Sequence, residues 1–449
     1  MGSCNTSEKA SIENIYKLDG MVPFFKALPF GLQHILTMFM ANLAPIIMIT
    51  SSANPTLTPD ELAKLIQNAM FISGIATLIQ LYPVWKIGAK LPIVMGCSFT
   101  FTAVLGSIAA NHGYGAAAGA VIVAGLFEGS LGLLITNWNK VVAPIVCAAV
   151  VMSIGLSLFS VGARAFGGGY TDYFGSEKNL ILGSFTLIVC ILWNVYSKGF
   201  FKQLSILMGM IAGYILALFL HQTTLSNLLD NGLVSFPHIL PIKPTFDLAD
   251  IISVAIIFLV SAAETVGDSS AVVSGGLDRE ITNKELSGSI ACDGFSSSLS
   301  GLFGCPPTTS FSQNVGLINM TKVVNRFTIM TGVLCMILAS IFPPMGTFFS
   351  SLPEAVLGGC TITMFGSILV SGLMMASKCG FSQRNIIILS ISLSIGLGFT
   401  APSEANIWLN LPTFFRSVFA DNCVALVFVL AFLLNLFLPQ ESGDEKVGS

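Results

Sequence analysis

The sequence has few charged residues: Asp, Glu, Lys and Arg make up 10% of its 449 residues, against roughly 25% in soluble globular proteins. Together with a hydrophobic share of 53%, this scarcity excludes a soluble enzyme. The 20 basic and 23 acidic residues nearly cancel and form no basic cluster, so a nucleic-acid partner is also excluded.

Several sequence motifs are missing as well. The ten cysteines include no CxxC pair, so neither a zinc site nor a disulfide framework is expected. There is no Walker motif and no GxGxxG that follows a strand and opens a helix, which disfavours ATP-driven transport. No nucleophile with a base and no paired metal ligands recur, so we expect no catalytic residues, no metal and no cofactor. The polar first twenty residues do not form a signal peptide and predict a cytoplasmic tail.

Long apolar runs dominate the remainder of the chain. A helix that crosses a bilayer needs about 20 mostly apolar residues, and fourteen such runs lie between residues 28 and 438. With the N-terminus inside, fifteen of the 20 basic residues fall in cytoplasmic loops and five fall outside, namely Lys64, Arg164, Lys178, Lys243 and Arg416. The pattern predicts an all-α polytopic membrane protein with both termini in the cytoplasm, and the absence of targeting signals favours a bacterial inner membrane.

The longest extracellular connection, residues 222–246, divides the fourteen spans into seven and seven. An odd number of spans in each half means that the second half enters the membrane from the opposite side. This is the condition for an inverted repeat, which occurs in transporters whose site lies at the midplane of the membrane.

The third and tenth spans, which hold equivalent places in the two halves, are abnormal. Cys97 to Thr102 is rich in hydroxyls and is typical of a strand. Cys305 to Gly316 is also polar, with a helix expected to begin near Ser310 or Ser312 and with Ser310 and Gln313 spaced as a capping box. Irregular backbone at membrane depth is tolerated only where it is buried in protein or lines a cavity. The two breaks therefore predict a ligand site between them.

Ionisable residues within the spans are few, and such residues are functional candidates because they are costly in a membrane. Glu264 and Asp268 in the eighth span are four residues apart and share one helix face, where their repulsion favours a retained proton. His34 in the first span is a candidate to bond a buried carboxylate or shuttle a proton, although a lone histidine in a membrane span more often makes a structural hydrogen bond. Three further carboxyl residues have no motif around them and are interpreted as hydrogen-bonding or boundary residues: Glu128, Asp293 and Glu354.

The segment Gln313-Asn314-Val315-Gly316, followed by Thr321-Lys322, closely resembles the signature of the nucleobase/ascorbate transporter family, also called nucleobase:cation symporter family 2. Four other segments agree with this resemblance, which extends over about residues 24 to 440: Leu32-Gln33-His34, Gly96-Cys97-Ser98-Phe99, Ala263 to Asp268, and Gly301 to Gly304.

The resemblance implies fourteen spans in two inverted halves, with short strands in spans 3 and 10 and with core and gate domains. It also implies a homodimer formed through the gate domains and alternating access by movement of one domain against the other. The corresponding parts of this chain are an N-terminal tail (1–23), the core domain (24–137 and 247–343), the gate domain (138–221 and 344–438), a linker (222–246) and a C-terminal tail (439–449).

By position, the resemblance makes Glu264 and Gln313 substrate-binding residues, with Asn314 supporting Gln313. Ser98 and Phe99 are implied to supply backbone contacts and an aromatic wall, and Phe311 a further aromatic ring. Asp268 is the position associated with proton coupling in the family, for which Glu264 and His34 are the other candidates. Cys97 and Pro306-Pro307-Thr308, where many members have Pro-Asn-Thr, depart from the family pattern and bear on the shape of the site.

Glutamine both donates and accepts hydrogen bonds, so Gln313 suits a base edge that presents C=O beside N–H. In the family, Gln at this position accompanies xanthine and urate, and Glu accompanies uracil. The sequence thus favours a symporter for xanthine or uric acid driven by protons, with sodium as the alternative coupling ion. A uracil or other pyrimidine permease and, on the same fold, an anion transporter are the competing functions.

Overall fold

The structure of the chain, a computed structural model, describes residues 11–135, 143–169, 173–198, 200–223, 234–401, 405–408, 410, 419–420 and 422–439. The expected outside position of Arg416, the middle of the 222–246 linker and most of the 439–449 tail lie outside the described residues.

The described residues are mostly helical. The first half of the chain contains η1 (Ile12–Tyr16), α1 (Phe24–Ser51), α2 (Pro59–Leu81), β1 (Met95–Cys97), η2 (Phe99–Phe101), α3 (Thr102–His112), α4 (Tyr114–Leu134), α6 (Pro144–Phe166), α7 (Glu177–Tyr196), α8 (Phe200–Gln203) and α9 (Ser205–Phe219). The second half contains α10 (Leu248–Gly276), α11 (Asn283–Leu302), β2 (Thr308–Ser310), α12 (Ser312–Thr321), α13 (Arg326–Ala339), α14 (Pro343–Ser350), α15 (Glu354–Cys379), α16 (Gln383–Phe399), η3 (Ala405–Trp408) and α18 (Cys423–Phe437).

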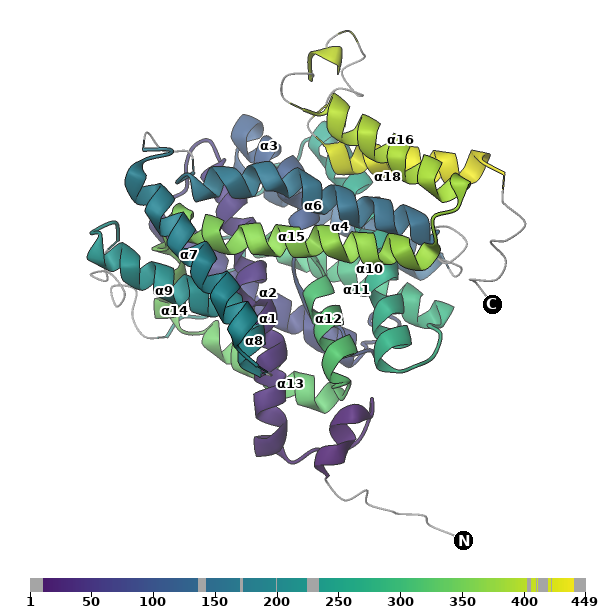
Figure 1. The fold of residues 1–449 in the computed structure, drawn as a ribbon, viewed down its shortest axis with the longest axis horizontal. Coiled ribbons are helices and arrows are strands. Elements are labelled where there is room, and N and C mark those ends of the chain that lie inside the picture. Colours follow the sequence, from purple (N-terminus) through teal and green to yellow (C-terminus); the bar gives the residue numbers. More distant parts are fainter. Residues whose placement is uncertain are drawn as a thin grey trace.

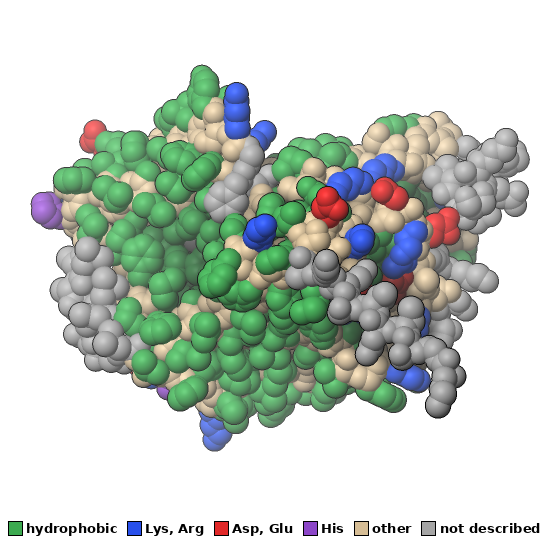
Figure 2. Space-filling model, turned by 90° about the horizontal axis from the view of Figure 1, so that it is seen from below, with side chains coloured by type: hydrophobic (Ala, Val, Ile, Leu, Met, Phe, Trp, Pro, Cys, Tyr) green, Lys and Arg blue, Asp and Glu red, His purple; other side chains and the backbone are tan. Residues whose placement is uncertain are grey.

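Large apolar side chains cover much of the outside of the protein. In the described part of the chain, seven helices are long and apolar enough to cross a membrane, or eight if α13 and α14, bent by 87°, form one span. Hydrophobic side chains occupy most of the face drawn in Figure 2, and most of the few charged ones lie from its centre to its right side, with others at the edges. On α7 the exposed apolar residues include Phe185, Ile188, Leu192 and Val195. Such a surface suits hydrocarbon and identifies a multi-pass membrane protein.

The helices pack in two groups. In the first, α15 lies against α6 and α7, and α16 lies against α18; Figure 1 shows α6 and α15 side by side across the middle of the view. In the second group, α4 packs on α11 and α10, and α13 packs on α1 and α2. The groups meet where α10 contacts α6 and where α12 contacts α15. The two short strands lie within the second group, between α2, α10 and α11.

The predicted N-terminal tail is partly folded against the rest of the protein. Ile15 and Val22 are buried with Ala27 and Val323 in a small apolar cluster. The backbone N–H groups of Val324 and Asn325 both donate to the carbonyl of Ile15. A polar segment whose few apolar residues have no helical period is expected to be a free tail, yet these residues are sufficient to attach it to the turn between α12 and α13.

An ion pair reinforces this attachment. Arg326 Nε donates to Asp19 Oδ1 at 3.0 Å, and Lys90 Nζ lies 3.5 Å from Asp19 Oδ2. Partial burial acts to raise the pKa of Asp19, but the hydrogen bonds and positive charge of Arg326, with Lys90, outweigh it and hold that pKa below its usual value of 3.8. The pair therefore stabilises the folded segment at neutral pH, and this contribution disappears as the pH falls through the lowered pKa.

Asp19→Asn is expected to loosen the N-terminal segment by about 0.2–1 kcal/mol, because the pair is half-exposed and screened. Hydrogen exchange of the Val324 and Asn325 amides measures the effect. It should quicken in the variant at neutral pH, and in the parent protein only under strongly acidic conditions. Asp60→Asn, which removes an exposed ion pair with Lys64 in the first turn of α2, is the control for loss of a surface carboxylate. Equal exchange in the parent and Asp19→Asn at neutral pH would show that apolar packing alone holds the segment.

Candidate functional site

The interrupted third and tenth spans meet in a two-stranded antiparallel sheet. Met95 pairs with Ser310, Gly96 with Thr309 and Cys97 with Thr308. The first strand therefore begins two residues earlier than the hydroxyl-rich stretch suggested, and Phe99–Phe101 forms a short 3-10 helix instead. The helix of the tenth span begins at Ser312, as expected. Each of the two spans is thus a short strand followed by a helix. The point where strand changes to helix lies inside the protein.

The predicted capping box at Ser310 and Gln313 is wrong. The N-cap residue of α12 is Phe311, and no side chain caps this helix. The Ser310 hydroxyl instead donates to Asp268 Oδ2 at 2.8 Å. The buried carboxylate of another span is a stronger acceptor than the local alternative, because charge strengthens a hydrogen bond.

Side chains of α1 and α2 hold β1 in place. Asn42 Oδ1 accepts from the backbone N–H of Cys97 at 2.7 Å and from the Ser73 hydroxyl at 2.7 Å. The Thr77 hydroxyl accepts from the backbone N–H of Met95 at 2.9 Å. These bonds satisfy strand groups that would otherwise be unpaired in the membrane.

Every residue of β2 is held by a side chain of α10 or α11. Ser297 Oγ accepts from the Thr308 N–H at 3.0 Å. The Thr309 hydroxyl donates to Asp293 Oδ2 at 3.2 Å. Asp268 accepts from both Ser310 and, at 2.8 Å, the hydroxyl of Ser312 at the start of α12. Asp268 therefore links α10 to the strand and to the helix that follows it.

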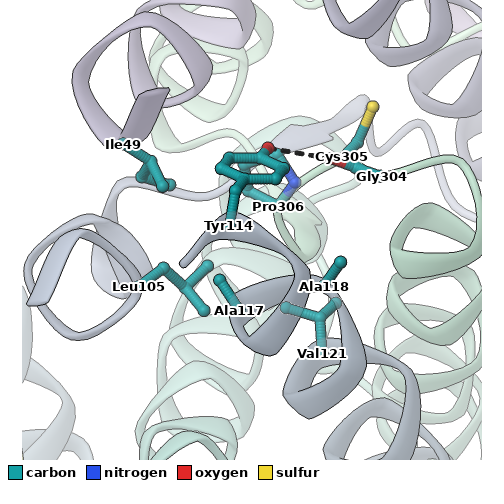
Figure 3. A pocket seen from close by; sticks show the side chains of 9 residues that line it. All are labelled: Ile49, Leu105, Tyr114, Ala117, Ala118, Val121, Gly304, Cys305 and Pro306. Atoms are coloured by element: carbon teal, nitrogen blue, oxygen red, sulfur yellow. Dashed lines mark hydrogen bonds between the residues drawn. The ribbon is translucent and has the colours of Figure 1, made fainter. Parts of the chain in front are cut away.

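The segment that leads into β2 is fixed from α4. The Tyr114 hydroxyl donates to the carbonyl of Gly304 at 2.8 Å, and its ring lies beside Cys305 and Pro306 around a cavity of about 10 Å³ (Figure 3). A cavity of this size holds at most about one water molecule. It therefore belongs to the support of the strand and not to a ligand site.

Glu264 and Gln313 retain hydrogen-bonding capacity that no protein group uses. Glu264 Oε2 accepts from the Thr100 hydroxyl at 2.7 Å, while Oε1 has no partner among the described residues. Gln313, one residue into α12, makes no side-chain hydrogen bond in the described structure. Both side chains are only partly buried. Because α10 contacts both η2 and α12, these two side chains lie on elements that adjoin the sheet.

His34 and Asn314 bond to each other in two ways. Asn314 Oδ1 accepts from His34 Nδ1 at 2.9 Å, and Asn314 Nδ2 donates to the backbone carbonyl of His34 at 3.3 Å. Of the two roles expected for His34, the described residues show the structural hydrogen bond, and its partner is an amide and not a carboxylate. The pair joins α1 to α12 directly behind Gln313.

The remaining expected residues have different surroundings. The Phe99 ring packs edge-on against Phe365 of α15, with ring centroids 5.3 Å apart. Ser98 is used locally: its hydroxyl caps η2, and its N–H donates to the Pro307 carbonyl at 2.8 Å. Phe311 is buried beside Gly96, where an added Cβ would lie 2.2 Å from its Cε2 atom.

The last residue of the signature has a structural role. Lys322 ends α12 in a left-handed conformation, and its ammonium donates to the carbonyl of Gly275 near the C-terminus of α10. It also lies 3.4 Å from Asp278. A cation at this position balances the negative end of the α10 dipole. Lys322 therefore ties the end of the helix that carries Gln313 to the end of the helix that carries Glu264.

The supporting residues on α2 and α11 were not identified from the sequence. Five polar residues of α2 are buried inside an otherwise apolar helix: Gln67, Asn68, Ser73, Thr77 and Gln80. The last three follow one face of the helix. In α11 the buried serines are Ser289, Ser296, Ser297, Ser298 and Ser300, beside the buried Asp293. Their helical spacing was the available signal, because buried polar groups in a membrane helix need partners and thus indicate unpaired backbone nearby.

Comparison with known proteins agrees with this architecture. The family model described as Permease family matches residues 25–404. The xanthine permease of Bacillus subtilis (strain 168) is 32% identical over 431 residues, which cover 94% of this chain and 96% of that protein. Xanthine permease XanP of Escherichia coli (strain K12) is 30% identical over 446 residues, covering 96% of this chain and 95% of that protein.

Two solved structures share the fold at low sequence identity. The transmembrane domain of the cyanobacterial bicarbonate transporter BicA has a TM-score of 0.55 at 17% identity and covers 86% of this chain and 97% of its own. The murine Slc26a9 anion transporter in the inward-facing state has a TM-score of 0.56 at 12% identity, covering 98% of this chain and 74% of its own. The family match and the two permease relatives lead to the same conclusion: this chain belongs to the nucleobase/ascorbate transporter family and is a membrane permease, not an enzyme.

Proposed function

We propose that this protein is a secondary active transporter that imports an oxidised purine, xanthine or uric acid, together with a proton by alternating access. The observation that carries the proposal is the pair of partly buried side chains with unused hydrogen-bonding capacity, Glu264 Oε1 and the Gln313 amide. A planar base between them would accept and donate at Gln313 and donate a ring N–H to Glu264. The names of the two bacterial relatives support the same substrate class.

The carboxyl groups around the site support cation coupling. Glu264, Asp268 and Asp293 accept hydrogen bonds only from hydroxyl groups, and no described Lys or Arg forms an ion pair with them. Buried carboxylates without a cationic partner are unfavourable, so a proton or another small cation must balance part of their charge. Asp268 is the proposed coupling residue. Its protonation would change the hydrogen bonds that it accepts from Ser310 of β2 and Ser312 of α12.

The proposed site also involves the neighbouring aromatic residues and the His34–Asn314 pair. Phe99 would form one wall of the site, and its contact with Phe365 of α15 would make the site sensitive to movement between the two helix groups. Phe311 would support the opposite strand, and Ser98 would fix the backbone of η2. His34 would orient Asn314 and thereby Gln313.

The two helix groups would be the two domains of the transporter. The helix group with the strands would be the core domain and the group around α6 and α15 the gate domain, within fourteen spans of a seven-plus-seven inverted repeat. Two copies would associate through their gate domains in a bacterial inner membrane, with both termini in the cytoplasm. Sodium is the alternative coupling ion.

A specific feature separates this proposal from anion transport on the same fold. Glu264 would repel a small anion, and no described Lys or Arg forms an ion pair with the carboxyl groups of the site. A uracil permease is the alternative within the family, and Gln313 argues against it.

Uptake by purified protein in lipid vesicles tests the proposal. Xanthine or urate uptake should rise when the outside is acidified, and a protonophore should abolish the rise. Uracil and sulfate serve as competing substrates in the same vesicles. Uptake that responds to sodium but not to pH would reject proton coupling, and preferred uptake of uracil or sulfate would reject the purine assignment.

Gln313→Glu should weaken oxopurine binding by about 1–3 kcal/mol, since it removes a donor and places an acceptor against the ligand carbonyl. Thermal-shift measurements of the same preparation with xanthine and with uracil compare the two affinities. A bound ligand stabilises the folded protein by RT ln(1 + [L]/Kd). Uracil binding should be unchanged or improved. Asn319→Asp, further along α12, is the matched control for added charge. Unaltered xanthine affinity in Gln313→Glu would remove Gln313 from the contact set.

A further inference from the structure

Glu128 of α4 is a buried acid that the proposed transport site does not use. Its side chain is 1% exposed, and neither carboxyl oxygen has a hydrogen-bond partner in the described structure. The surrounding helices are in close contact: a Cβ built on Gly294 of α11 would lie 2.0 Å from the backbone nitrogen of Gly129. Glu128 therefore lies where α4 and α11 touch, and its carboxyl group is buried away from solvent.

Asp293 on α11 is the group best placed to interact with Glu128. It is fully buried; its Oδ2 accepts from Thr265 and Thr309, whereas its Oδ1 has no partner among the described residues. The backbones beside the two acids are in contact, since a Cβ built on Gly294, the residue after Asp293, would lie 2.7 Å from the backbone carbonyl carbon of Glu128. Unsatisfied acceptors on both carboxyl groups indicate that a positively charged or donating species is needed between α4 and α11.

The other elements packed on α4 supply no cation. On α10, the ionisable residues are Asp250, Glu264 and Asp268, all acidic. On α3, the only ionisable residue is His112, and its Nδ1 lies 2.8 Å from Asp250 at the far end of α10. Lys284 at the start of α11 is exposed, and among the described residues no Lys or Arg forms an ion pair with Glu128 or Asp293. We therefore expect the charge that balances the two acids to come from solution.

We propose that Glu128 and Asp293 form a second proton-binding pair, buried between α4 and α11 and separate from Glu264 and Asp268. A proton satisfies a carboxyl group without further ligands, whereas divalent ions such as Ca²⁺ require about six to eight oxygen atoms. The proton resides on Glu128, which has no donor of its own. Asp293 transmits the state of the pair to the sheet, because Thr309 of β2 donates to it and pairs with Gly96 of β1.

This pair deepens the proposed function, since its consequence for transport rests on proton symport, but its existence is measurable without any substrate. Infrared spectroscopy of the full-length protein in lipid, at neutral pH and without purine, detects the carbonyl stretch of protonated carboxyl groups. Glu128→Gln should remove one component of that signal. Asp293→Asn should retain this component and shift its frequency, because the neighbour of the Glu128 carboxyl group changes. Glu177→Gln, an exposed acid at the start of α7, should leave the region unchanged.

If Glu128→Gln does not fold, isotope-labelled glutamate is incorporated into the parent protein and into Asp293→Asn. The expected result is a labelled carbonyl component in the parent that shifts in frequency in Asp293→Asn. A Glu128→Gln spectrum identical to that of the parent would overturn the proposal, as would loss of the component on addition of sodium at constant pH. Gradient-driven uptake is scored separately. If the infrared component behaves as expected but purine uptake ignores pH, the pair stands and symport fails. If uptake is proton-driven and the component is absent, symport stands and the pair fails.

Discussion

Replacing Glu264 with glutamine is expected to abolish measurable substrate binding. The amide oxygen of the introduced glutamine would keep the 2.7 Å hydrogen bond from Thr100, which leaves its NH2 group at the position now held by Oε1. A donor would then face the ring N–H of the base, so two donors would oppose each other. A mispaired buried polar group costs about 1–3 kcal/mol, and more when a charge is removed. Isothermal titration with xanthine measures the loss.

Asp268→Asn is the matched comparison, one helical turn along α10. Its partners are the hydroxyls of Ser310 and Ser312, each 2.8 Å away, and a hydroxyl can accept from an amide as well as donate to one. The variant should therefore keep β2 and α12 in place and retain xanthine binding, while losing accumulation driven by the pH gradient. Full binding by Glu264→Gln would exclude Glu264 from the substrate contacts. Normal accumulation by Asp268→Asn would move the coupling proton to Glu264 or His34.

Gly96→Ala is expected to eliminate both substrate binding and transport through a purely steric effect. A Cβ at this position would lie 2.2 Å from Phe311 Cε2, 2.8 Å from Asn42 Oδ1 and 2.9 Å from Met38 Cε. The ring cannot move without displacing the start of α12, and Asn42 cannot move without releasing the N–H of Cys97. Overpacking of a core typically costs about 1–3 kcal/mol, and here the strain falls on the sheet itself.

Thermal unfolding and xanthine binding of Gly96→Ala are measured beside Gly366→Ala. Gly366 lies in α15 and has no atom within 4 Å of an added Cβ, so alanine there should be neutral or slightly stabilising. A Gly96→Ala protein that binds and transports like the parent would show that the contact between Gly96 and Phe311 does not position the site.

The class of the protein, and the two interrupted spans around which its site is proposed, could be predicted from the sequence alone. Composition and the length of apolar runs reflect the solvent that surrounds each segment, so a membrane protein is recognisable without its tertiary structure. The breaks in the third and tenth spans were also visible locally, because clustered hydroxyl and proline residues lower helix propensity within an apolar run. The signature around Gln313 then identified the family.

The pairing of the polar groups, in contrast, depended on how the helices pack. The partner of His34 is Asn314, 280 residues away, and the partner of Asp268 is Ser310, 42 residues away. A carboxylate or an imidazole accepts many partners of similar strength, so the choice depends on which helices are packed together and not on the local sequence. The same reason explains why the capping box was wrong and why Glu128, which has no distinguishing motif, is the buried acid whose oxygens have no partner in the described structure.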